Sequence, residues 1–157
     1  MNCPICRSPS NRVFEKYGYW VCECKQCHHR FAEISTSADH TQRIYQDDYF
    51  YGGAAGYPNY ISEAKILSSH GKRYSVLLNK FTAPGTVLDV GAAAGFILQG
   101  FQEGGWRGMG LEPNASMAQY GRSHLGIQIE SGSLEQFTSR EQFDLVSMIQ
   151  VIPITAR

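Results

Sequence analysis

The stretch from Thr86 to Phe96 constrains the fold of this chain more than any other feature. Its sequence is TVLDVGAAAGF, an apolar run that ends in Asp89 and continues into a loop of small residues. A second apolar run ends in Glu112, twenty-one residues after Gly91. This layout is typical of a βαβ unit, in which a glycine turn lets a ligand approach the backbone and a distal carboxylate accepts ribose hydroxyls. We therefore expect an α/β fold with a parallel sheet.

The residues of this loop restrict the kind of ligand. A dinucleotide fingerprint that starts at Gly91 needs glycine at position 93 and glycine or alanine at position 96, but the chain has Ala93 and Phe96. No Gly-Lys-Ser/Thr follows, as a phosphate-binding loop requires. The pattern therefore favours a nucleoside ligand without phosphate. The alternative is a turn whose small residues serve packing alone.

A second motif lies at the amino terminus, where four cysteines form two C-x2-C pairs separated by seventeen residues. The pairs are Cys3 with Cys6 and Cys24 with Cys27. Two such pairs joined by a hairpin bring four thiolates around one tetrahedral ion, so the spacing predicts a structural zinc ribbon. A segment of about thirty residues buries too little surface to fold alone, and the metal should contribute much of its stability. The fifth cysteine, Cys22, is interpreted as a small core residue.

Composition limits the classes of partner. All five cysteines lie in the first 27 residues and the start of the chain does not resemble a signal peptide, which argues against a disulfide framework. No apolar run is long enough to span a bilayer. The formal net charge is zero, which argues against nucleic acid as a partner. We expect a soluble, cytoplasmic protein, and the oligomeric state stays open.

The segment between the two motifs is rich in aromatic residues. Six tyrosines and phenylalanines lie between positions 45 and 60, interrupted by glycines. Two interpretations are equally supported: packing of the ribbon onto the next domain, or a lid whose tyrosines line a cavity, with Tyr49 and Tyr57 as candidates.

The periodicity of the remaining chain predicts alternating helices and strands. We expect helices over 62–81, with Leu67, Tyr74, Leu78 and Phe81 on one face, and over 93–104. Expected strands cover 87–90, 109–111, the region of 127–129, and 143–152, the last of them buried on both faces.

Taken together, these motifs resemble a known family. The paired cysteines, the aromatic segment with GYPNY, and then LDVGAAAGFIL, GLEP, GSLE and FDLV occur in the order found in bacterial class I S-adenosylmethionine (SAM) dependent methyltransferases with an amino-terminal zinc ribbon. Members are often associated with sugar, polysaccharide or natural-product biosynthesis. The resemblance covers nearly the whole chain up to about position 152.

The resemblance implies a fold, domains and site residues. It implies a zinc ribbon over 1–32, an aromatic connector over 33–60, and over 61–157 a partial Rossmann-like methyltransferase sheet with strand order 3-2-1-4. It places SAM against a set of eight residues and implies a small-molecule acceptor. These cofactor-binding residues are Asp89, Gly91, Ala93, Gly95, Glu112, Pro113, Ser133 and Leu134.

Two of these roles are specific. Asp89 would polarise the ammonium group of the methionine moiety, and Glu112 would accept both ribose hydroxyls. Pro113 would pack on the adenine, and Ser133 and Leu134 would lie near its edge, unless they form an ordinary loop.

The carboxyl end departs from the family. A family histidine that is a candidate base corresponds to Ile154, and three further strands with their helices do not follow. We therefore expect a carboxyl-terminally truncated methyltransferase with an incomplete acceptor site and no identifiable catalytic base. Two alternatives are a ribosomal RNA methyltransferase with a zinc module and a non-catalytic module that binds zinc and SAM.

Overall fold

The computed structural model describes residues 1–34, 46–52 and 58–151, which fall into two compact units. Residues up to 34 belong to the first unit and residues 46–151 to the second. The predicted connector at 33–60 lies partly outside the described residues, and Tyr57 lies wholly outside them.

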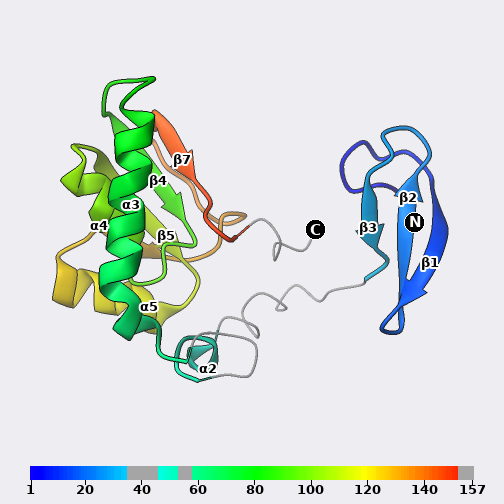
Figure 1. Ribbon diagram of the computed structural model, residues 1–157, viewed down its shortest axis with the longest axis horizontal. Helices are drawn as coiled ribbons and strands as arrows, with labels where there is room; N and C mark the ends of the chain where they lie inside the picture. The colour runs from blue at the N-terminus through cyan, green and yellow to red at the C-terminus, as the bar shows by residue number, and fades with distance from the viewer. Residues whose placement is uncertain (35–45, 53–57, 152–157) are drawn as a thin grey trace. The chain divides into compact units, whose positions relative to one another are not determined.

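The first unit is a three-stranded antiparallel sheet in the order β1-β2-β3 (Figure 1). Its strands are β1 (Ser10–Lys16), β2 (Tyr19–Cys24) and β3 (Arg30–Ala32). Tyr17 and Gly18 join the first two strands, and both have positive φ (53° and 80°). A two-residue turn with both φ values positive matches the right-handed twist of the flanking strands, which explains why the hairpin closes here.

The second unit is built on a four-stranded parallel sheet with the order β6-β5-β4-β7. The strands are β4 (Thr86–Val90), β5 (Arg107–Glu112), β6 (Ile129–Ser131) and β7 (Leu145–Ser147). This arrangement confirms the predicted strand order, in which the third, second, first and fourth strands lie side by side.

Helices precede and connect these strands (Figure 1). A 3-10 turn (Tyr60–Glu63) leads into α3 (Ala64–Leu78); α4 (Phe96–Glu103) joins β4 to β5. The short α5 (Ala115–Tyr120) and a π-helical turn (Gly121–Leu125) join β5 to β6, and α2 (Asp47–Phe50) comes before all of these. Among the described residues, no helix has the length and apolar character needed to cross a membrane.

Alternation along the strands gives the sheet two apolar faces. Val87 packs with Leu98 and Phe101 of α4 and with Trp106, and α3 contributes Tyr74 to the same cluster. Leu88, the next residue along β4, points to the opposite face, because the side chains of successive strand residues alternate between the two faces. That face is covered by side chains of the loops around β7, namely Phe137, Phe143, Met148 and Val151.

Helices α3 and α4 approach each other through glycine. A Cβ atom added at Gly71 would lie 2.0 Å from the carbonyl oxygen of Ile97, and one added at Gly100 would lie 2.2 Å from that of Ser68. Both contacts are with backbone, which cannot move aside without separating the helices. The close packing of α4 therefore depends on the absence of these two side chains.

Three expectations about individual elements are wrong. The fourth strand covers only Leu145–Ser147 instead of 143–152, and it is not buried on both faces, since Val146 is 51% exposed. Phe81 lies beyond the end of α3 and is 80% exposed, so it does not share the buried face of Leu67 and Leu78. Helix α4 begins at Phe96 and not at position 93.

Candidate functional site

The loop after β4 is shaped by three residues in the left-handed region. Gly91, Ala93 and Gly95 have φ values of 72°, 49° and 84°, and α4 starts directly after Gly95. The amides of Gly91 and Ala92 both donate to the carbonyl oxygen of Leu111 in β5, at 2.8 and 3.2 Å. The loop therefore turns back over the carboxyl ends of β4 and β5, where ligands bind in open α/β sheets.

Glu112 ends β5, and its carboxylate points at this loop. Its Oε2 accepts from the backbone amide of Ala93 at 2.7 Å, and its Oε1 accepts from the amide of Asn114 at 2.8 Å. The residue is 3% exposed. Burial raises the pKa of Glu112 to about 7, the nearby charge of Asp89 adds to this rise, and the two amides oppose it.

Asp89 lies in β4 beside Ser147 of β7. Its Oδ1 accepts from the hydroxyl of Ser147 at 2.6 Å, and the side chain is buried. Burial raises the pKa of the Asp89 carboxyl to about 6, while the hydrogen bond from Ser147 acts in the opposite direction. The two acidic side chains thus lie close together at the carboxyl end of the parallel sheet.

The negative charge that Asp89 and Glu112 carry when ionised favours a cationic ligand. Asp89 and Glu112 are both acidic and buried, and like charges in a site of low dielectric repel strongly. When ionised, the two carboxylates attract a cationic ligand, but an acid at the end of the second strand does not by itself exclude a dinucleotide, whose ribose uses the same group. The argument against a phosphate-bearing ligand therefore rests on the loop sequence, which lacks both phosphate-binding patterns.

Part of the space beside the loop is occupied by another segment of the chain. A Cβ atom added at Gly91 would lie 2.4 Å from Cγ2 of Val151, which packs on the apolar face of the sheet. A ligand can use this side of Gly91 only if the side chain of Val151 moves.

The other predicted residues lie along the same edge. Pro113 separates Glu112 from Asn114, whose Oδ1 caps α5 by accepting from the amide of Met117 at 2.9 Å. Ser133 and Leu134 follow β6 in a turn, which the amide of Gly132 anchors to β5 by donating to the carbonyl oxygen of Glu112 at 3.0 Å. The sheet therefore brings all the predicted segments to one edge.

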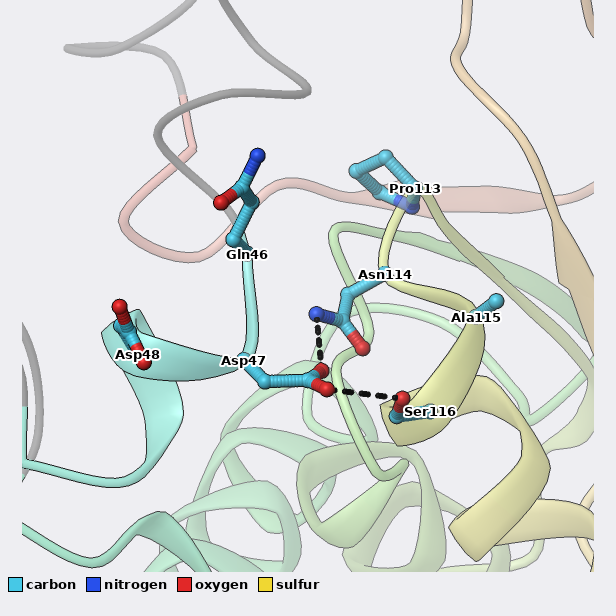
Figure 2. A pocket seen from close by; sticks show the side chains of 7 residues that line it. All are labelled: Gln46, Asp47, Asp48, Pro113, Asn114, Ala115 and Ser116. Carbon is cyan, nitrogen blue, oxygen red and sulfur yellow. Dashed lines mark hydrogen bonds between the residues drawn. The ribbon is translucent and has the colours of Figure 1, made fainter.

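A pocket of about 430 Å³ opens beside Pro113, between α2 and the start of α5 (Figure 2). It is lined by Gln46, Asp47, Asp48, Pro113, Asn114, Ala115 and Ser116. The carboxylate of Asp47 points at α5, where it accepts from Nδ2 of Asn114 at 3.1 Å and from the hydroxyl of Ser116 at 3.3 Å. No sequence pattern singled out Asp47, because the partners lie 67 and 69 positions away along the chain.

Aromatic residues before α3 pack close to the loop. Phe50 of α2 meets Tyr60 edge to face at 5.5 Å, and Tyr60 stacks on Phe96 at 5.6 Å. Ala93 and Ala94 of the loop belong to the same apolar cluster, and the partly buried Tyr49 packs against it. Phe50 and Tyr60 are therefore part of the core of the second unit.

In the first unit, the four paired cysteines come together. Their Sγ atoms all lie within 4.8 Å of one another, with Cys3–Cys27 at 3.6 Å, Cys6–Cys24 at 3.4 Å and Cys6–Cys27 at 3.5 Å. Four thiolates bound tetrahedrally at a Zn–S distance of about 2.3 Å would have sulfurs about 3.8 Å apart. The set therefore has the size of a zinc site.

The surroundings of this cluster agree with such a role. The amides of Gln26 and Cys27 donate to Sγ of Cys24, at 3.4 Å each, which would stabilise a thiolate. Cys22 is buried outside the group, in agreement with its predicted core role.

No family model matches the chain, and no curated protein does. Among solved structures, it resembles DesVI of Streptomyces venezuelae with a TM-score of 0.51 and 23% identity, over 59% of this chain and 41% of that one. It also aligns with the plantazolicin methyltransferase BpumL in complex with SAH (TM-score 0.43, 16% identity, 54% and 35% of the two chains). A further match is the glycopeptide N-methyltransferase MtfA (0.42, 21%, 54% and 44%).

The likeness to DesVI and the strand order establish a methyltransferase-like α/β fold. The matched part covers less than half of the length of each of these three structures.

Proposed function

We propose that the second unit binds SAM and belongs to an enzyme that transfers its methyl group to a small-molecule acceptor. The observation that carries this proposal is the buried carboxylate of Glu112, which faces the amide of Ala93 in the glycine turn. A ligand seated on this turn would have its ribose hydroxyls beside an acceptor that is already fixed. The methyltransferase-like fold and the acidic character of the edge support the same ligand.

The cofactor would supply an activated methyl group on a sulfonium. The residues of this chain would bind and orient it: Glu112 would hold the ribose, and Asp89 would attract the ammonium of the methionine moiety. The backbone of Gly91, Ala93 and Gly95 would line the approach. Methyl transfer is an in-line displacement, so such a site acts mainly by alignment and by excluding water. Pro113 and the turn at Ser133 and Leu134 are assigned to the adenine side.

Isothermal titration of the chain with SAM tests this proposal. At about pH 8, where the Glu112 carboxyl is mostly ionised, Glu112→Ala is expected to weaken binding by about tenfold or more, because hydroxyl bonds to a charged acceptor contribute about 1.5–3 kcal/mol. Glu130→Ala is the matched control, since Glu130 is an exposed glutamate on the neighbouring strand β6. Equal affinity of the wild type and Glu112→Ala would remove the ribose role, and no binding by the wild type would refute the proposal.

We also propose that Cys3, Cys6, Cys24 and Cys27 hold a structural Zn²⁺. All four sulfurs would serve as ligands, which leaves no open position for catalysis. Elemental analysis of freshly purified chain is expected to give one zinc per chain, and Cys27→Ser should lower this value. Cys22→Ser, the control, should retain the metal. A wild-type zinc content far below one would contradict the assignment.

A further inference from the structure

A chain of hydrogen bonds runs from α2 to the glycine turn. Asp47 accepts from the side chain of Asn114, the backbone amide of Asn114 donates to Glu112, and Glu112 accepts from the amide of Ala93 on its other oxygen. These bonds join three segments that are distant in sequence. Figure 2 shows the first contact, in which the Asp47 carboxylate lies between Asn114 and Ser116.

Asn114 is the central residue of these hydrogen bonds, because both its side-chain oxygen and its side-chain nitrogen are engaged. Its Oδ1 accepts from the amide of Met117, and its Nδ2 donates to Asp47, so the orientation of the side-chain amide is fixed from two sides. Its backbone amide is then held against Oε1 of Glu112 at 2.8 Å. A shift of Asn114 would therefore displace a hydrogen bond on which the orientation of Glu112 depends.

A second, apolar connection runs from α2 to the same turn. Phe50, three residues after Asp47, packs on Tyr60, and both belong to the cluster that contains Ala93. Helix α2 thus contacts the turn through aromatic packing and contacts Glu112 through Asn114. Because the aromatic packing holds α2 in place, the carboxylate of Asp47 is presented to α5 at a defined position.

We propose that Asp47 is a positioning residue for the cofactor site: it holds Asn114 so that Glu112 keeps the orientation needed to accept ribose hydroxyls. This inference rests on the proposed SAM binding and extends it, since it makes the segment before the α/β fold a determinant of cofactor affinity. Asp47 acts through Asn114 and need not touch the cofactor.

Titration with SAM tests this role. Asp47→Ala is expected to weaken SAM binding about five- to tenfold, in the usual range of coupling between linked sites. Asp47→Asn is expected to restore near wild-type affinity, because its carbonyl oxygen can take the place of Oδ1 and accept from Nδ2 of Asn114, while its amide nitrogen can donate to the hydroxyl oxygen of Ser116. Asp48→Ala is the matched control: Asp48 lines the same pocket, and its substitution should leave the affinity unchanged.

A double-mutant cycle separates positioning from a general structural effect. If Asp47 acts through Glu112, then Asp47→Ala should cost affinity in the wild type and cost nothing further in a Glu112→Gln background, with titrations extended to millimolar SAM. Ser116→Ala, which removes one of the two bonds to Asp47, provides the same comparison if Asp47→Ala does not fold.

Two results would overturn the inference: wild-type affinity in Asp47→Ala, or an equal loss in both backgrounds. In both cases SAM binding by the wild type would leave the proposed function standing. If the wild type does not bind SAM, the proposed function and this inference fail together.

Discussion

The raised pKa of Glu112 makes a quantitative prediction about stability. The carboxyl has a pKa of about 7 in the folded chain against an ordinary value of 4.5, so the folded state holds its proton more tightly than the unfolded state. The resulting stabilisation is complete below pH 4.5 and is lost as the pH rises through about 7. Linkage gives a decline of about 2.5 kcal/mol in the free energy of unfolding between about pH 5 and pH 8 from this group alone.

Glu112→Gln should remove this part of the pH dependence. Glutamine keeps the shape of the side chain but turns an N–H toward one of the two backbone amides, and this contact costs about 1–3 kcal/mol that does not itself vary with pH. The measured quantity is therefore the difference between wild type and Glu112→Gln in how the free energy of unfolding changes with pH. The difference between the two proteins at any single pH is not used. Effects of pH on the cysteine cluster are common to both proteins and cancel in the comparison.

Urea unfolding followed by tryptophan fluorescence provides the assay. The chain has two tryptophans, Trp20 in the first unit and the buried Trp106 in the second. In a Trp20→Phe background the signal reports on the second unit alone. The reasoning is refuted if the free energy of unfolding of the Trp20→Phe protein changes with pH in the same way with and without Glu112→Gln, between about pH 5 and pH 8. Asp89→Asn should change the slope at lower pH, because the pKa of Asp89 is raised to about 6 only.

Three further predictions concern metal and packing. Removal of the proposed Zn²⁺ by a chelator should change the fluorescence of Trp20 and leave that of Trp106 unchanged; a parallel change in both would contradict separate units. Gly71→Ala should lower the free energy of unfolding by about 2 kcal/mol, measured in urea, because its Cβ would meet backbone of α4. Gly91→Ala should lower the free energy of unfolding by about 2 kcal/mol, because Gly91 has a positive φ and its added Cβ would contact Val151. Val151→Ala should recover part of this loss. An equal loss with Val151 and with Val151→Ala would exclude the contact.

Local patterns in the sequence predicted the central part of the fold well. The run that ends in Asp89, the loop of small residues and the run that ends in Glu112 imply adjacent parallel strands, and the observed strand order agrees. The cysteine spacing likewise predicted which four residues come together. In both cases the information lies within a short stretch of chain, which a periodicity or a spacing can capture.

The sequence failed where the outcome depends on distant neighbours. An apolar run after Leu145 reads as a strand buried on both faces, but β7 is short and Val146 is 51% exposed, so the face to which Val146 points is not fully covered there. Phe81 continues the period of α3 but falls after the helix has ended. The contact between Asp47 and Asn114 could not be predicted, since no short-range rule relates the two positions.

The amides on either side of Glu112 have a consequence for engineering. A side chain held at both oxygens has already lost its rotamer freedom during folding, so the sugar of the proposed cofactor would meet a rigid partner and would not need to immobilise it. Recognition of a sugar by Glu112 should therefore depend on a pre-organised side chain that does not adapt to the ligand. Redesign of the proposed site toward other nucleosides would therefore do better to vary the turn around Ser133 than to exchange the acid itself.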